Sequence, residues 1–299
     1  MTIFDRRTFL VAGAALAAGA CTRGSAPDPA ADARADAARF EAIRATLGPG
    51  GRLGVAAIDT ASGRELRFDA DSRYAMASTF KLPLAAAVLA LADQGKLSLD
   101  EELAFEPGKP IEHSPSIEAN LARGRLPVIQ LCAAIVERSD NGAANLLLRR
   151  IGGPEALTRF IRAQDDPVTR LDRYETELNS NLPGDPRDTT SPRAMAALVR
   201  NLLVEDSLAE QSRRHLSTWL TKAVPGPDRL KSGFPAPPWL VGNKTGTGAN
   251  GAVNDVAIAW RSGRPPVVVA SYQSGGTADR AVRAAAHASV GRLVAERFA

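Results

Sequence analysis

The hydrophobic periodicity of this 299-residue chain changes twice, and that limits the possible folds more than any other feature. Residues 52–60 and 64–69 have the pattern of β-strands, and a long region of helical periodicity follows them. Strand character then returns in residues 239–245, 252–260 and 265–273. Turn residues separate neighbouring strands, and Asn250-Gly251 is a typical hairpin dipeptide. We therefore expect all five strands in one antiparallel sheet.

Helices are predicted at both ends of the chain and throughout its middle. Residues 31–47 form a helix that stops at Gly48-Pro49-Gly50, and residues 278–298 form an amphipathic helix. Residues 79–95 are apolar on nearly every side, which indicates a helix buried all round. Further helical patterns cover residues 126–139, 143–153 and 191–204.

These elements predict a two-lobe α/β fold. The five-stranded antiparallel sheet, flanked by the terminal helices, is expected from residues 37–73 and 221–299. Residues 74–220 are expected to form an all-helical lobe inserted into the first. A cleft between two lobes is the default position for a ligand.

The N-terminus has the layout of an export signal. In residues 1–21, the pair Arg6-Arg7 precedes a short apolar run rich in Ala and Gly, which favours the twin-arginine route. Cys21 follows small residues, as at a lipoprotein processing site. The alternative is a plain cleaved signal with an incidental cysteine. Residues 22–36 resemble a flexible linker. We expect an exported protein of the periplasm or cell envelope, with membrane contact only through a lipid at Cys21.

Composition narrows the possible partners. The 37 basic and 33 acidic residues give a net charge of +4 without any block of like charges, which argues against nucleic acid. The three histidines and two cysteines lack zinc-ligand spacing, so neither a metal nor another cofactor is expected. Cys132 lies among helically spaced apolar residues and is expected to be a buried thiol. We expect a monomer that acts on a small molecule.

Three short motifs carry the chemistry. Ser78 and Lys81 lie at positions i and i+3 of a predicted helix start, where a lysine of lowered pKa can take the serine proton. The helix start also directs free N–H groups at a developing oxyanion. Ser139-Asp140-Asn141 lies between two predicted helices and offers a hydroxyl and an amide. The alternative interpretation of this motif is a helix N-cap.

The third motif, Lys244-Thr245-Gly246, ends a predicted strand. Lys244 offers a charge for a carboxylate, Thr245 and Thr247 offer hydroxyl donors, and Gly246 permits close approach of a substrate backbone. Residues 246–251 also fit Gly-x-Gly-x-x-Gly, but a dinucleotide site needs that motif to open a helix, and here it leads into a hairpin.

The three motifs in this order resemble the penicillin-recognising serine enzymes, and the chain is most similar to the class A serine β-lactamases. Residues 173–179, Arg-Tyr-Glu-Thr-Glu-Leu-Asn, resemble the omega-shaped loop of that family, and the resemblance spans residues 37–299. It implies hydrolysis of the β-lactam amide bond of penicillins and cephalosporins, conferring resistance. It also implies an ion pair between Arg173 and Asp188 that closes the loop.

The resemblance implies a role for each motif residue. Ser78 attacks the lactam carbonyl, and Lys81, or Glu175 through a water, takes its proton. Ser139 passes a proton to the leaving nitrogen. Backbone N–H groups of Ser78 and Thr247 hold the oxyanion. The binding residues implied are Asn141 for the side-chain amide, Lys244 and Thr245 for the carboxylate, and Asn179, which with Glu175 positions the deacylating water.

Three positions depart from the commonest family pattern. His113 replaces an aromatic residue at the cleft rim, where it could stack on substrate or be an exposed loop residue. Val253 replaces an arginine after the hairpin, so Arg229 is our candidate for a second carboxylate ligand. Thr176 follows Glu175 where a proline is common, which leaves the isomer of that peptide bond open.

Two other functions remain open on the sequence. A related transpeptidase, carboxypeptidase or penicillin sensor would acylate without turnover, but it would lack the loop glutamate and asparagine that Glu175 and Asn179 supply. A non-catalytic lipoprotein that binds cell-wall fragments would not need Ser78, Lys81 and Glu175 together.

Overall fold

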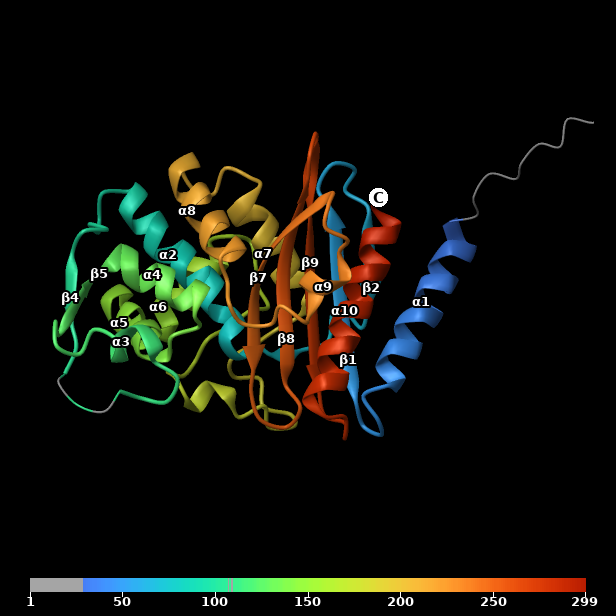
Figure 1. Ribbon diagram of the computed structural model, residues 1–299, viewed down its shortest axis with the longest axis horizontal. Helices are drawn as coiled ribbons and strands as arrows, with labels where there is room; N and C mark the ends of the chain where they lie inside the picture. The colour runs from blue at the N-terminus through green and yellow to red at the C-terminus, as the bar shows by residue number, and fades with distance from the viewer. Residues whose placement is uncertain (1–28, 107, 109) are drawn as a thin grey trace, which may run out of the picture.

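A computed structural model describes residues 29–299 except 107 and 109 (Figure 1). The predicted export signal, Cys21 and the first part of the predicted linker lie outside the described residues. Figure 1 shows the helices of the middle of the chain on one side of a central sheet and helices from the two ends of the chain on the other.

The central sheet has five antiparallel strands in the order β2-β1-β9-β8-β7, which confirms the predicted fold class. The Asn250-Gly251 turn joins β7 to β8 in a hairpin whose register pairs Thr247 with Val253. β7 lies at one edge of the sheet, so one side of its backbone is not paired with a strand. The strands are β1 (Arg52–Asp59), β2 (Glu65–Phe68), β7 (Trp239–Thr247), β8 (Val253–Arg261) and β9 (Arg264–Ser274).

Both faces of the sheet are covered, because alternate residues of each strand enter different cores. In β9, Val267 and Val269 pack in the core beneath α1 (Pro29–Ala45) and α10 (Arg280–Arg297), whereas Val268 and Ala270 pack against the middle helices. This explains why β9 is almost continuously apolar. The terminal helices are joined by ion pairs, among them Arg297 Nε to Asp36 Oδ1 at 2.7 Å.

The middle of the chain is mostly helical. Residues 81–90 of α2 are all buried, as its apolar sequence predicts. Cys132 is also fully buried, and burial raises the pKa of its thiol. The helices are α2 (Lys81–Asp93), α3 (Pro115–Glu118), α4 (Val128–Glu137), α5 (Asn141–Ile151), α6 (Pro154–Arg162), α7 (Pro192–Leu203), α8 (Glu210–Thr221) and α9 (Leu230–Gly233), with 3₁₀ turns η1 (Ala77–Phe80) and η2 (Glu177–Asn179).

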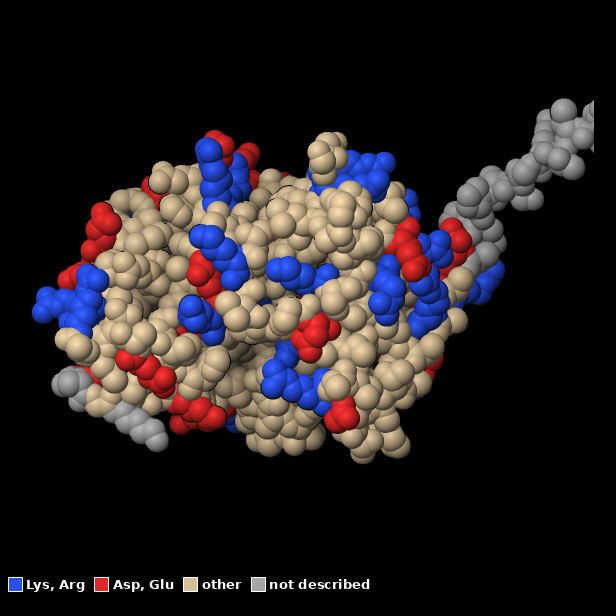
Figure 2. All heavy atoms as spheres, viewed as in Figure 1, with Lys and Arg blue, Asp and Glu red and all other residues tan. Residues whose placement is uncertain are grey.

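Two small sheets were not predicted from the sequence. β3 (Tyr74–Ala75) pairs with β6 (Thr189–Thr190), and β4 (Glu102–Ala104) pairs with β5 (Arg125–Pro127). The first of these sheets matters for the site, because it ties the end of the omega-shaped loop to the segment that leads into η1. On the face in Figure 2, acidic and basic side chains are interspersed, with no extended area of one sign.

Candidate active site

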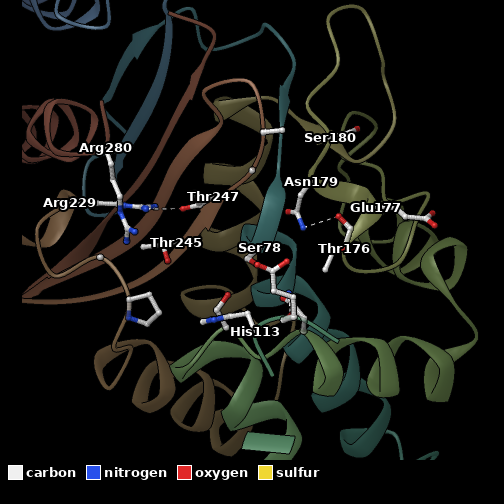
Figure 3. A pocket seen from close by; sticks show the side chains of 17 residues that line it. Ser78, His113, Thr176, Glu177, Asn179, Ser180, Arg229, Thr245, Thr247 and Arg280 are labelled. Carbon is white, nitrogen blue, oxygen red and sulfur yellow. Dashed lines mark hydrogen bonds between the residues drawn. The ribbon is translucent and has the colours of Figure 1, made fainter. Parts of the chain in front are cut away.

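A cleft of about 870 Å³ opens where β7 faces η1 and the loop before α5 (Figure 3). Its walls come from segments that are far apart in the sequence, including η1, residues 176–180 and β7. Its volume is that of a small-molecule site. Many of the predicted site residues line it, namely Ser78, His113, Ser139, Asn141, Asn179, Arg229, Thr245 and Thr247.

Ser78 lies in η1, one turn before α2 begins. The preceding residue, Ala77, has φ +44°, a left-handed conformation that is unusual for alanine and marks a sharp turn of the chain. Lys81 is the first residue of α2, and its Nζ lies 2.9 Å from Ser78 Oγ. The expected contact across one turn is therefore present.

Lys81 is fully buried and surrounded by oxygen atoms. Its Nζ lies 2.8 Å from Glu175 Oε1 and 2.9 Å from the Ser139 carbonyl oxygen, and it also contacts Asn141 Oδ1. Burial lowers the pKa of Lys81, while the Glu175 carboxylate opposes that shift. Glu175 Oε1 also lies 3.4 Å from Ser78 Oγ. Two candidate bases thus flank the Ser78 hydroxyl.

Ser139 and Asp140 lie in the connection between α4 and α5, and Asn141 is the first residue of α5. The three residues have different roles. Asp140 is the N-cap of α5: its carboxylate accepts the N–H of Ala143 at 2.8 Å and also that of Ser116 at 2.7 Å. The capping interpretation therefore applies to Asp140. Ser139, with φ +60°, and Asn141 instead line the cleft.

Lys244 lies behind the cleft surface and is 1% exposed. Its Nζ donates to Ser139 Oγ at 3.0 Å and to the Thr245 carbonyl at 2.9 Å. Burial, and then the charge of Lys81, place the pKa of Lys244 well below its ordinary value. Ser139 therefore lies between the two lysines, with its carbonyl toward Lys81 and its hydroxyl toward Lys244.

Gly246 is needed for a reason that the sequence did not indicate. A Cβ at Gly246 would lie 2.7 Å from the Met76 carbonyl oxygen and 3.2 Å from the Ser78 nitrogen. The backbone that approaches Gly246 closely is therefore the protein's own, at Met76 and Ser78. This approach brings the edge strand β7 beside Ser78.

The loop that carries Glu175 is closed by the expected ion pair. Arg173 Nε lies 2.6 Å from Asp188 Oδ2, and Asp188 is fully buried. Asn179 Nδ2 donates to Glu175 Oε2 at 2.6 Å. The Glu175–Thr176 peptide bond, whose isomer the sequence left open, is cis.

Sequence reasoning missed Asn145, which holds the backbone of Glu175. Its Oδ1 accepts the Glu175 N–H and its Nδ2 donates to the Glu175 carbonyl, both at 2.9 Å. Asn145 is 6% exposed. A signal was present, because Asn145 lies four residues after Asn141 and therefore on the same helix face.

Sequence reasoning also missed Asp255, a fully buried carboxylate on β8. It accepts from Asn243 Nδ2 at 2.9 Å and from the Leu230 N–H at 3.0 Å. In the sequence, Asn243 directly precedes Lys244, and Leu230 directly follows Arg229. Burial raises the pKa of Asp255 to about 7, against the opposing charges of Arg229 and Lys244.

Arg229 and His113 lie at the cleft but differ in how firmly they are held. Arg229 is 4% exposed and donates to the Gly246 and Asn254 carbonyls at 3.0 and 2.8 Å and to Thr247 Oγ1 at 2.9 Å. Burial lowers the pKa of Arg229. His113 is exposed at the rim, and its Nε2 lies 3.1 Å from the Arg138 carbonyl.

Within the part of the chain that the structure describes, no group of three or more His, Cys, Asp or Glu side chains is arranged to hold a metal ion. Nor does that part contain a helix long and apolar enough to cross a membrane.

A serine that lines a cleft beside an edge strand, in contact with a buried lysine and a buried glutamate, is typical of serine enzymes of acyl transfer. The Beta-lactamase enzyme family matches residues 38–298. The chain thus belongs to the class A serine β-lactamases, hydrolases that open the amide bond of β-lactams and confer resistance to them.

Individual relatives agree with this assignment. The chain is 41% identical to "Beta-lactamase AST-1" of Nocardia asteroides over 89% of this chain and 87% of the relative. It is 42% identical to "Carbapenem-hydrolyzing beta-lactamase KPC" of Klebsiella oxytoca over 83% of this chain and 84% of the relative. Among solved structures, "Ancestral (GNCA) Beta-lactamase class A" is 48% identical, with a TM-score of 0.85, covering 88% of this chain and 100% of that chain.

Proposed function

We propose that the protein hydrolyses penicillins and cephalosporins through an acyl-enzyme on Ser78. The contacts of the Ser78 hydroxyl carry this proposal, since Lys81 Nζ is 2.9 Å and Glu175 Oε1 3.4 Å from its oxygen. As Ser78 Oγ bonds to the lactam carbonyl carbon, its proton passes to Lys81, or through a water to Glu175. The backbone N–H groups of Ser78 and Thr247 hold the oxyanion. Ser139 then delivers a proton to the leaving nitrogen as the amide bond breaks.

The second half of the reaction uses Glu175 and Asn179. Glu175 takes a proton from a water, which attacks the ester carbon and releases Ser78. Asn179 supports this role in two ways. Its Nδ2 holds one carboxylate oxygen of Glu175, and its buried Oδ1 accepts no hydrogen bond from any described residue. That oxygen is an acceptor for the attacking water.

Substrate binding is assigned to the walls of the cleft. The carboxylate of the β-lactam lies toward Lys244, Thr245 and Arg229, where the buried cations are. The side-chain amide lies toward Asn141, and His113 lies at the rim where an acyl substituent passes.

Turnover of benzylpenicillin and of a cephalosporin by Ser78→Ala and Glu175→Gln tests this mechanism. Ser78→Ala should abolish hydrolysis, and Glu175→Gln should accumulate an acyl-enzyme, with a general-base contribution of about 10²–10⁴ in rate. Ser289→Ala, which alters a half-buried serine on α10 away from the cleft, is the matched control and should retain activity. Hydrolysis by Ser78→Ala at the wild-type rate would overturn the proposal.

We also propose that the protein is exported as a monomer tethered by a lipid at Cys21. The support is the twin-arginine pair and the small residues before the cysteine. Cys21→Ser should move the protein from the membrane fraction to the soluble fraction. An unchanged soluble distribution of both forms would favour a plain cleaved signal.

A further inference from the structure

Arg280 is a cation at the cleft that the mechanism does not use. It is the first residue of α10, it is exposed, and it lines the cleft. Figure 3 shows the side chains of Arg280 and Arg229 on the same side of the cleft. The two are close enough that the charge of Arg280 lowers the pKa of Arg229.

The fold gives Arg280 no stabilising role. No described residue makes a hydrogen bond or ion pair with its side chain. It lies in the first turn of α10, where the helix dipole disfavours a cation, and that turn has no acidic residue. The preceding Asp279 is occupied as the N-cap, accepting the N–H of Val282 at 2.9 Å. The charge of Arg280 therefore slightly destabilises the start of α10.

The other cations at this end of the cleft are already engaged. Lys244 donates to Ser139 and Thr245, and Arg229 donates to two carbonyls and a hydroxyl. The nearby acids that act on Arg229 are Asp255, which is fully buried, and Asp228. Arg280 thus keeps all five of its donors for a group that enters the cleft.

We propose that Arg280 is a specificity-determining residue that binds a second anionic group on the substrate, beyond the ring carboxylate. The inference rests on the proposed function, in which that carboxylate lies toward Lys244 and Arg229. In cephalosporins the substituent at carbon 3 is attached beside the carbon that bears the carboxylate, so it enters the same end of the cleft. The substrate class favoured is therefore β-lactams, above all cephalosporins, with an anionic substituent on that side.

The size of the effect follows from the exposure of Arg280. An ion pair at an exposed site changes an affinity by about two- to fivefold, and salt weakens it. The effect should also be local. Arg292 is the matched control, since it is exposed on the same helix, donates to Ser289 Oγ and lines a different recess of the surface.

The test compares two cephalosporins with the same acyl side chain and either an anionic or a neutral substituent at carbon 3. Their dissociation constants are measured by calorimetry in a Ser78→Ala background, which needs no turnover. Adding Arg280→Gln should weaken the anionic compound about two- to fivefold more than the neutral one, and the difference should shrink in high salt. Adding Arg280→Lys should preserve part of the preference, and Arg292→Gln all of it.

Equal weakening of both compounds by Arg280→Gln, or no weakening, would overturn the proposal. An equal loss of preference in Arg292→Gln would show that only net charge matters, which also overturns it. Turnover of the neutral compound with Ser78 intact tests the proposed function separately. If the protein does not hydrolyse the neutral compound, the proposed function fails. The ratio of the two dissociation constants still measures the preference that Arg280 provides.

Discussion

Replacing Asn145 with alanine should release Glu175 while leaving the rest of the cleft in place. Asn145 makes two hydrogen bonds, both of 2.9 Å, to the backbone N–H and carbonyl of Glu175. Both residues are buried, at 6% and 7% exposure. Each buried group left without a partner costs about 1–3 kcal/mol, so the change should destabilise this loop by about 2–6 kcal/mol.

The consequence should fall on deacylation more than on acylation. Ser78 and Lys81 contact each other directly, whereas the Glu175 carboxylate depends on the position of its own backbone. We expect acyl-enzyme decay to slow by up to about 10²–10⁴-fold, the contribution of a positioned general base. Rapid-quench mass spectrometry with benzylpenicillin gives the two rates, and thermal unfolding gives the stability.

Asn201→Ala is the matched control. Asn201 lies on α7, and its Nδ2 makes a single 3.2 Å hydrogen bond to the Gln164 carbonyl. That variant should lose about 1 kcal/mol and deacylate normally. If Asn145→Ala deacylates at the wild-type rate, the loop holds Glu175 without Asn145 and the reasoning is wrong.

Three further predictions concern residues beside the cleft. Burial raises the pKa of Asp255 from 3.8 to about 7, so the folded state keeps the proton of this carboxyl group at pH values where the unfolded state has lost it. The free energy of unfolding should therefore fall by about 3 kcal/mol through this group as the pH rises from 4 to 7. Asp255→Asn removes this pH dependence. In urea unfolding, the free energy of unfolding of the variant minus that of wild type should therefore rise from pH 4 to pH 7. A difference that stays constant over this range would contradict the prediction. Gly246→Ala places a Cβ 2.7 Å from the Met76 carbonyl, so acylation should slow and stability drop by about 1–3 kcal/mol, and wild-type acylation would refute it. Arg173→Gln leaves the Asp188 carboxylate buried without its ion pair and should cost about 3–5 kcal/mol in thermal unfolding, and an unchanged melting temperature would count against it.

The four long strands of the sheet and the long helices could be predicted because their periodic patterns extend over eight or more positions, and β2 could be predicted from the turn that joins it to β1. β1 and β9 alternate between two cores, and α2 is apolar all round. The β3–β6 and β4–β5 pairs could not be predicted in this way, because strands of two or three residues are too short to show a period. They form only when distant segments meet.

The contact between Ser78 and Lys81 could be predicted because the two residues lie one helical turn apart in the sequence. Asn145 and Asp255 were missed because each lies within a regular helix or strand and belongs to no recognisable motif. Each is important because of a hydrogen-bond partner that is distant in the sequence. Asn145 binds Glu175, 30 residues away, and Asp255 binds Leu230, 25 residues away. Gly246 was identified, but the backbone that approaches it belongs to Met76, which only the tertiary structure shows.

The central claim is that Ser78 forms an acyl-enzyme that Glu175 allows water to release. Time-resolved intact mass spectrometry of the wild-type protein and Glu175→Gln with benzylpenicillin tests it most directly. We expect rapid product formation with little lasting adduct for wild type, and an adduct of penicillin mass on Ser78 for the variant. A stable wild-type adduct without product would instead indicate a penicillin-binding protein or sensor. The absence of both adduct and product would contradict the covalent mechanism itself.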